Sequence, residues 1–347
     1  MKFKASSLAH PNIALIKYWG RNPNHPSHLN IPTNDSISMT KESIDTEATG
    51  IRLLTHTTIE FSEEFSEDTG FLKDQETLIP FNRIQMERIN KVVNPLKELA
   101  GIDLNFKMVS ENKFPTAAGL ASSASAFAAL ATCAAKALNL NLDKKELSKY
   151  ARLGSGSASR SIHGGFVWWH RGNSHDSSYA EQLCQCNEFD IAAVIAVINR
   201  GEKEVSSDVG INYAQSSAFN QIRIEQSLKQ SEEIKKAIED NDFSTVGQIA
   251  EKNCLYMHSV MMTSSPPLFY WNPNTLKVIK TITRKRKNEG IEFYFTVDAG
   301  PNIHCLCRTE DLDDAQQMIE DIGIPKIDIV KVRQADYGSK TVDQHLF

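Results

Sequence analysis

The feature that constrains this chain most is a run of small residues between a strand-like and a helix-like stretch. Residues 115–124 read Pro-Thr-Ala-Ala-Gly-Leu-Ala-Ser-Ser-Ala, follow an alternating stretch at 103–110 and open an alanine-rich stretch that reaches about Leu138. A helix start leaves backbone N–H groups without partners, and the helix dipole favours an anion beside them. The hydroxyls of Ser122 and Ser123 suit phosphate or Mg²⁺. The segment therefore predicts a phosphate site with a nucleotide as ligand; a tightly packed helix start without a ligand is the alternative.

Length and composition are those of an ordinary globular protein. The 347 residues suffice for one large or two medium domains, and 41% of them are apolar. The net charge of -5 provides no basic field for nucleic acid. No apolar run approaches the roughly 20 residues of a membrane span, and the N-terminal residues do not form a signal peptide. We therefore expect a cytoplasmic protein that binds neither nucleic acid nor membrane.

The cysteines make only a weak case for a metal site. Six are present, and they include the Cys-x-Cys pairs at 184 and 186 and at 305 and 307. Zinc sites usually have Cys-x2-Cys spacing. Reduced thiols are the expected state, with a metal site as the alternative.

Strand and helix patterns alternate irregularly, which favours an α+β chain. Strands are expected at 51–62, 103–110, 165–170, 190–198, 291–297 and 326–332. Helices are expected at 120–138, 144–153, 212–239, 243–263, 273–287 and 310–322. The weakest join falls near 186–188, so we predict an N-terminal domain at 1–187, which binds ATP and phosphate, and a C-terminal domain at 188–347.

Two segments near the N-terminus combine polar groups that can bind an anion. Residues 9–21 place Lys17 and Arg21 on either side of a tyrosine and a glycine turn, and residues 31–40 are small and polar. A surface cation pair and a polar turn are the plain structural explanations of these segments.

Two later segments carry an arginine and an acid in suggestive surroundings. Residues 154–161 set hydroxyls and Arg160 on a glycine-rich turn, and an arginine fork suits phosphate or carboxylate. Residues 296–302 place Asp298 at a strand end before a Gly-Pro turn, where catalytic acids are often found. A flexible linker and a capping acid are the alternatives for each segment alone.

Taken together, these segments resemble the GHMP kinase superfamily and, within it, the mevalonate diphosphate decarboxylases. The strings Lys-Tyr-Trp-Gly and Asp-Ala-Gly-Pro-Asn are fairly specific to the decarboxylase branch. The resemblance extends from Ala9 to about Asn302. It is carried by residues 12–20, 114–124, 154–160, 164–167 and 298–302.

The resemblance implies a two-domain GHMP kinase fold. The N-terminal domain is expected to be like the second domain of ribosomal protein S5, and the C-terminal domain to be ferredoxin-like. We expect the active site in the cleft between them, and a homodimer.

The resemblance also implies an activity, the ATP-dependent decarboxylation of mevalonate 5-diphosphate to isopentenyl diphosphate. Asp298 would hold the 3-hydroxyl group and take its proton, and Lys17 would lie beside Asp298 and the transferred phosphoryl group. Arg160 would bind the substrate carboxylate. The diphosphate would be bound by Tyr18, Arg21, Ser155 and Ser157.

ATP and Mg²⁺ are the cofactors that the resemblance implies. The small-residue segment would hold the ATP phosphates, and Ser123 is the candidate Mg²⁺ ligand. The predicted ATP-binding residues are Pro115, Ala118, Gly119, Leu120, Ala121, Ser122 and Ser123.

The chain departs from the family pattern at several positions. Arg21 stands where the family usually has lysine, and Asp208 where it usually has a neutral residue or arginine. Ile211 stands where methionine is frequent. An acid that points into a diphosphate pocket would weaken anion binding, and we expect Asp208 to face solvent instead. Residues 333–347 match nothing expected of the family, and no role is predicted for them.

These departures leave other functions open. One is a decarboxylase that acts on mevalonate 5-phosphate, and another is a mevalonate-type kinase without decarboxylation. A non-catalytic binding protein is the third. The presence of Lys17 and Asp298 argues against the last two.

Overall fold

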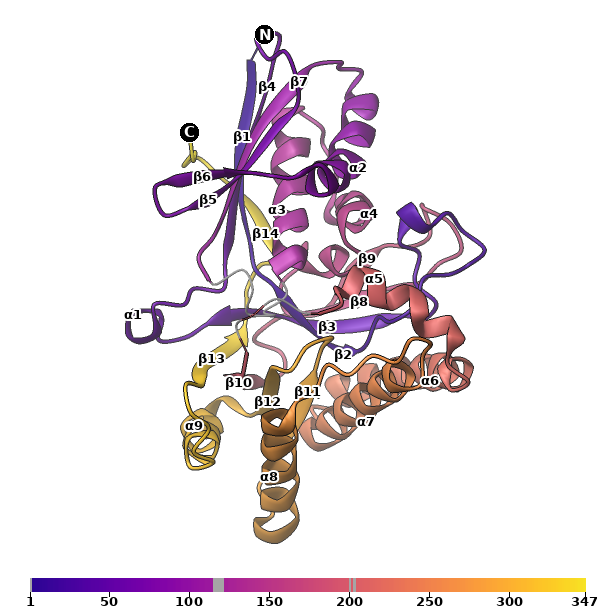
Figure 1. The fold of residues 1–347 in the computed structure, drawn as a ribbon, viewed down its shortest axis with the longest axis vertical. Helices are drawn as coiled ribbons and strands as arrows, with labels where there is room; N and C mark the ends of the chain where they lie inside the picture. Colours follow the sequence, from indigo (N-terminus) through magenta and orange to yellow (C-terminus); the bar gives the residue numbers. More distant parts are fainter. Residues whose placement is uncertain (1, 115–121, 200, 202–203) are drawn as a thin grey trace.

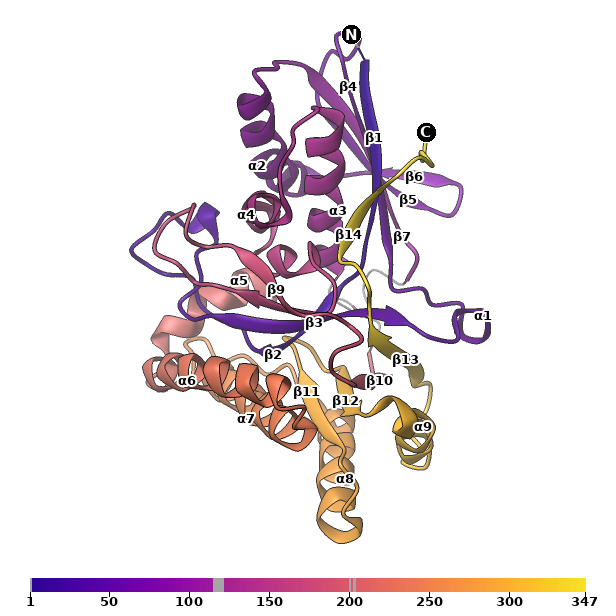
Figure 2. The ribbon, with the colours of Figure 1, turned by 180° about the vertical axis from the view of Figure 1, so that it is seen from behind.

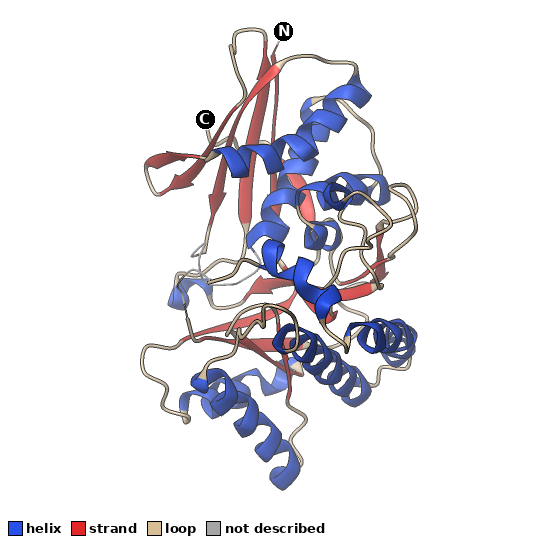
Figure 3. Ribbon diagram, turned by 45° about the vertical axis from the view of Figure 1, so that its right-hand side comes forward, coloured by secondary structure: helices blue, strands red, loops and turns tan. Residues whose placement is uncertain are grey.

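The upper half of the protein is a β-sheet with three long helices against one face. The computed structural model describes residues 2–114, 122–199, 201 and 204–347. Within them the upper sheet has the strand order β14-β1-β4-β7-β5-β6 (Figure 1). Its strands are β1 (Lys2–Ala9), β4 (Thr55–Ser62), β5 (Thr69–Asp74), β6 (Thr77–Pro80), β7 (Asn105–Asn112) and β14 (Ser339–Val342). The helices are α2 (Arg83–Ala100), α3 (Ser122–Ala137) and α4 (Lys144–Gly154), which gather beside this sheet in Figure 3.

Local sequence explains these helices. Asp143 accepts a hydrogen bond from the backbone N–H of Glu146 and starts α4, as its position predicts. Asn82 and Gln85 form a reciprocal capping box that starts α2, a helix not predicted from the sequence. Helix α3 is apolar nearly all round and is buried against β1 and β4, as predicted.

A second sheet crosses the middle of the molecule and continues into the lower half (Figures 1 and 2). Its strand order is β11-β12-β10-β13-β3-β8-β9, and β2 also pairs with β3. Its strands are β2 (Asn12–Ile16), β3 (Ser36–Ser43), β8 (Phe166–Trp169), β9 (Ala180–Cys184), β10 (Ala192–Val197), β11 (Tyr294–Val297), β12 (Ile303–Cys307) and β13 (Asp328–Gln334).

Helices cover the lower part of this second sheet. Helix α7 packs on α6, β2 and β11, so it supports the strands that precede the predicted catalytic residues. The long helices here are α6 (Asn220–Glu239), α7 (Phe243–Met262), α8 (Pro273–Glu289) and α9 (Leu312–Glu320). The short ones are α1 (Thr46–Thr49), α5 (Ser207–Gly210), η1 (Ser27–Leu29), η2 (Gly156–Ser161), η3 (Ile211–Ser216) and η4 (Thr309–Asp311).

The predicted elements are confirmed with shifted ends. The strand expected at 51–62 begins only at Thr55, and the helix expected at 212–239 is divided into η3 and α6. No strand was predicted for β1, β2, β3, β5, β6, β9 and β14. Many of these strands are short or rich in buried serine and threonine, which weakens their apolar alternation.

The C-terminal residues belong to both sheets. Residues at the end of β13 pair with β3, and β14 runs antiparallel to β1, with Ser6 opposite Val342. The Thr132 hydroxyl of α3 also donates a hydrogen bond to Ser339. Residues 333–347, for which no role was predicted, thus complete the upper sheet. The domain boundary between residues 187 and 188 stays a prediction. Strand β14 lies in the second predicted domain along the sequence, but it belongs to the sheet that is formed by strands of the first.

All six cysteines carry free thiols. In the described ranges, no group of three or more His, Cys, Asp or Glu side chains is arranged to hold a metal ion. None of the helices described here is long and apolar enough to cross a bilayer.

Candidate active site

An ion pair between the two halves of the sequence forms the centre of the site. Lys17 follows β2, Asp298 follows β11, and Lys17 Nζ lies 2.6 Å from Asp298 Oδ1. The backbone of Lys17 is fixed on both sides: its N–H donates to Asn253 and its carbonyl accepts from Asn34. The Lys17 side chain is 1% exposed and that of Asp298 38% exposed, so the carboxylate keeps an open side.

Asp298 is ionised at neutral pH. Burial by itself would raise its pKa, but the charge and hydrogen bond of Lys17 outweigh this effect. The charges of Lys41 and Arg160 act in the same direction, and the pKa of Asp298 falls below its ordinary value. The carboxylate can therefore accept a proton from a bound hydroxyl group.

Arg160 lies in the buried part of the site, and most of its guanidinium group forms no hydrogen bond to the described residues. Its side chain, on η2, is almost fully buried, and Nη2 donates to Asn12 Oδ1 over 3.3 Å. Its Nε and Nη1 atoms are buried without a hydrogen-bond partner among the described residues. Burial lowers the pKa of Arg160 to about 10, so it stays charged at neutral pH. A buried guanidinium with two unmatched donors suits a planar carboxylate.

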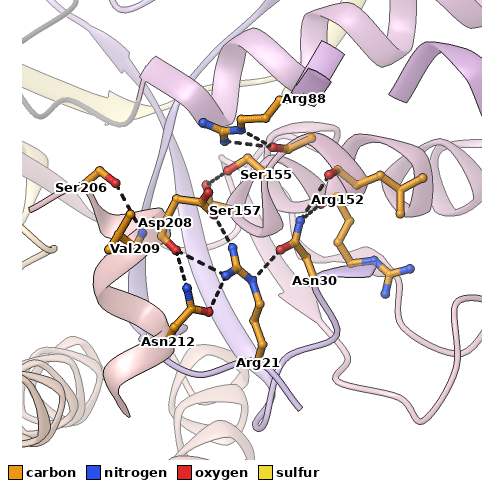
Figure 4. Close-up of polar contacts among 12 residues, drawn as sticks. Arg21, Asn30, Arg88, Arg152, Ser155, Ser157, Ser206, Asp208, Val209 and Asn212 are labelled. Carbon is orange, nitrogen blue, oxygen red and sulfur yellow. Dashed lines mark hydrogen bonds and ion pairs between the residues drawn. The ribbon is translucent and has the colours of Figure 1, made fainter. Parts of the chain in front are cut away.

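The predicted diphosphate residues lie together around the turn before η2. The buried hydroxyl of Tyr18 has no hydrogen-bond partner within the described part of the chain, and its ring packs 4.7 Å from Trp169. A Cβ on Gly156 would lie 2.6 Å from the Tyr18 ring, so only glycine fits there. The hydroxyls of Ser155 and Ser157 are 3.2 Å apart (Figure 4). The hydroxyl groups of Tyr18, Ser155 and Ser157 can therefore donate hydrogen bonds in the region around the turn before η2.

The Asp208 side chain is exposed to solvent, as expected, but it also binds a neighbouring cation. Although its side chain is 52% exposed, its carboxylate forms an ion pair with Arg21 Nη2 (Figure 4). The rest of the Arg21 fork is also occupied, since Nη1 donates to Asn212 and Nε to Asn30, each over 2.8 Å. The Asp208 carboxylate therefore neutralises the charge of Arg21.

Several residues near the site were not predicted. Arg88 of α2 donates twice to the carbonyl of Gly154 and lies close enough to Asp208 for their charges to interact. Asn12 donates to Ser161 and to the Ser157 carbonyl, and so holds η2. Asn12 lies inside a motif segment and could have been selected, whereas Arg88 belongs to a helix that the sequence did not predict.

The predicted nucleotide segment is only partly described. Pro115, Ala118, Gly119, Leu120 and Ala121 lie outside the described residues. Ser122 and Ser123 form the first turn of α3, as predicted, and are half-buried. Their roles in binding stay predictions, as does the placement of the site in a cleft between domains.

Comparison with known proteins identifies the family. Residues 9–180 match the family model of the diphosphomevalonate decarboxylase-like N-terminal domain, and residues 193–344 that of the mevalonate 5-diphosphate decarboxylase C-terminal domain. The diphosphomevalonate decarboxylase of Debaryomyces hansenii is 38% identical over 319 residues, which are 86% of this chain and 78% of that protein. The phosphomevalonate decarboxylase of Haloferax volcanii is 30% identical, with 92% and 93% covered.

A solved structure agrees with these matches. The structure of MDDEF in complex with MVAPP, AMPPCP and magnesium has a TM-score of 0.87 and 35% sequence identity, and covers 99% of this chain and 100% of that one. The expected two-domain fold is thereby confirmed. The chain belongs to the mevalonate diphosphate decarboxylase family.

Proposed function

We propose that this protein catalyses the ATP-dependent decarboxylation of mevalonate 5-diphosphate to isopentenyl diphosphate, with release of ADP, phosphate and CO2. The observation that carries the proposal is the Lys17–Asp298 ion pair, 2.6 Å long, beside the unmatched guanidinium of Arg160. A base, a cation and a carboxylate-binding fork are the groups that this reaction needs in one place. The family of the chain supports the same reaction.

The reaction follows from these groups. Asp298 takes the proton of the 3-hydroxyl group as its oxygen attacks the γ-phosphoryl group of ATP and ADP leaves. Lys17 keeps Asp298 ionised and offsets the charge that develops on the phosphoryl group. Arg160 holds the carboxylate. The C–O bond to phosphate and the C–C bond to the carboxylate then break, and the electron pair left by CO2 forms the double bond.

The phosphate groups are held by hydroxyls and helix ends. Tyr18, Ser155 and Ser157 bind the 5-diphosphate, with Arg21 behind them. Ser122 and Ser123 at the start of α3 face the ATP phosphates. The Ser123 hydroxyl would hold Mg²⁺ beside the phosphates, since Mg²⁺ commonly takes few ligands from the protein. When bound, the ion neutralises phosphate charge.

A second candidate substrate is mevalonate 5-phosphate. The observation in its favour is the Arg21–Asp208 ion pair, which removes a free positive charge from the diphosphate region. The relative from Haloferax volcanii is named a phosphomevalonate decarboxylase, which agrees with this candidate. The homodimer and the cytoplasmic location stay predictions.

One assay tests both candidates. CO2 and ADP release are measured with Mg-ATP, with mevalonate 5-diphosphate and mevalonate 5-phosphate offered in parallel. We expect a higher kcat/KM with the diphosphate. A higher value with the monophosphate would establish the second candidate, and ADP without CO2 would mean a kinase. If neither CO2 nor ADP is released with either substrate, the result would contradict a catalytic role.

A further inference from the structure

A second buried lysine, Lys41, interacts electrostatically with both members of the Lys17–Asp298 pair. Lys41 on β3 is 0% exposed and His304 on β12 is 3% exposed. Their Nζ and Nε2 atoms are 2.6 Å apart. Because this hydrogen bond joins two nitrogens, one must donate and the other must accept. When Lys41 is charged, its ammonium group has no lone pair and must donate to Nε2 of a neutral His304.

The charges around Lys41 do not balance. The positive charges of Lys17, Lys41 and Arg160 all act on the Asp298 carboxylate. Within the described residues, no other carboxylate lies at ion-pair distance from Lys41 or Lys17. A buried ammonium group without a counterion costs folding free energy. The region is therefore more positive than negative, and an anionic ligand would restore the balance.

We infer that Lys41, held by His304, is a positioning residue of the decarboxylation: its charge adds to that of Lys17 in stabilising ionised Asp298 and is balanced by the substrate carboxylate and the transferred phosphoryl group. This inference rests on the proposed function, because those anions belong to that reaction. Lys41 itself forms and breaks no covalent bond. Among the described residues, no hydrogen bond or ion pair joins Lys41 to Asp298, and the charge of Lys41 lowers the pKa of that carboxylate.

The charge of Lys41 depends on pH near neutrality. Burial lowers the pKa of Lys41 to about 7; Asp298 raises it and Lys17 lowers it. His304 stays neutral, because burial and both lysines lower its pKa well below the ordinary value. His258 on α7 is also neutral, because burial and the charge of Lys17 lower its pKa to about 3. The charged or titratable groups that interact with Lys41 are thus Asp298, Lys17 and His304.

The first experiment compares pH profiles. In the wild-type enzyme, kcat/KM should fall above a pH of about 7 as free Lys41 loses its proton. Bound anions raise the pKa of Lys41, so the profile of kcat should fall only at higher pH. In Lys41→Met the fall near neutral pH should be absent, and kcat/KM at pH ~6.5 should be roughly tenfold lower.

A matched control distinguishes the effect of removing a charge at the active site from the effect of removing a buried lysine elsewhere. Lys149 on α4 is also buried, but Glu146 pairs with it at 2.6 Å. Lys149→Met should leave the pH profile unchanged. At the partner of Lys41, His304→Gln keeps a hydrogen-bond acceptor and should preserve the profile. His304→Leu removes the acceptor, which disfavours the ammonium form and should move the fall to lower pH.

Thermal unfolding distinguishes a positioning lysine from a structural one. The folded-state pKa of Lys41 lies below the ordinary value, so protonation below pH 7 opposes folding. At pH ~6.5, Lys41→Met should therefore melt at the same or a higher temperature while its activity falls. A lower melting temperature together with an unchanged pH profile would assign Lys41 a structural role and overturn the inference.

The outcomes also separate this inference from the proposed function. CO2 release by the wild-type enzyme, together with an unaltered pH profile in Lys41→Met, would overturn the inference alone. Absence of CO2 release by the wild-type enzyme would overturn the proposed function and the inference with it.

Discussion

At the scale of single residues, the contact between Lys17 and Asp298 decides the protonation state on which the reaction depends. Burial favours a neutral carboxylic acid, and the lysine contact reverses that preference. The pKa of Asp298 lies below its ordinary value, so acidification to pH ~5 should not inactivate the enzyme through this group.

The first prediction concerns Asp298→Asn. The amide keeps the shape of the side chain but cannot take the 3-hydroxyl proton, and it leaves Lys17 without its counterion. We expect kcat for CO2 release to fall by about 10²–10⁴-fold. Substrate affinity, measured by calorimetry, should change far less, because Arg160 and the phosphate-binding residues are retained.

An exposed acid provides the control for that substitution. Asp313 on α9 is 90% exposed and pairs with Lys331 in the middle of β13. Asp313→Asn should retain wild-type kcat. Near-normal turnover in Asp298→Asn would remove Asp298 from the mechanism.

The second prediction concerns Asp208→Asn. The change removes the carboxylate that neutralises Arg21 and returns a positive charge to the diphosphate region. Because the pair is partly exposed, we expect KM for mevalonate 5-diphosphate to fall only about three- to tenfold. KM for the monophosphate should fall less. Equal KM values for the variant and wild-type enzymes would show that Arg21 does not interact with the second phosphate.

At the scale of elements, helix α7 holds β2 and β11 in place. Gly247 lies where α7 crosses β11, and a Cβ there would be 2.1 Å from the Tyr294 ring. Asn253 on the same helix accepts the backbone N–H of Lys17 over 2.7 Å. The position of α7 on the sheet thus fixes the backbone of a catalytic residue.

The third prediction is that Gly247→Ala destabilises the fold and impairs catalysis together. The added methyl group must push α7 away from β11, which should cost about 1–3 kcal/mol. Unfolding in denaturant measures the free energy, and kcat should fall as Lys17 moves. Gln248→Ala, at the exposed neighbouring position, should leave both unchanged. A fully stable Gly247→Ala variant would mean that α7 accommodates the methyl group without strain.

At the scale of the whole molecule, the C-terminal strand ties the two sheets together. After β13 has paired with β3 in the second sheet, the chain returns to the first as β14 at its edge, beside β1. Figure 2 shows β14 lying along β1. The first and last strands of the chain are therefore neighbours.

The fourth prediction concerns a chain that ends after Gly338. It lacks β14, so β1 loses its ladder partner and α3 loses the Thr132–Ser339 hydrogen bond. Each net hydrogen bond contributes about 0.5–1.5 kcal/mol, so the loss should exceed about 2 kcal/mol and lower Tm by several degrees. A chain that ends after Gln344 keeps β14 and is the control. Equal melting temperatures for the two chains would contradict a stabilising role of β14.

The sequence by itself determined the local elements and the chemical groups. The start of α4 at Asp143, the buried α3 and the motifs around Lys17, Arg160 and Asp298 could be predicted, because capping, apolar periodicity and motif spacing act over a few residues.

Only the tertiary structure decided which distant residues meet. Lys17 and Asp298 are 281 positions apart, Arg21 and Asp208 are 187 apart, and the ends of the chain pair as β1 and β14. Lys41 on β3 and His304 on β12 meet although β10 and β13 lie between their strands in the sheet. Packing and the exclusion of water set such contacts and their charges, and no local pattern along the chain encodes them.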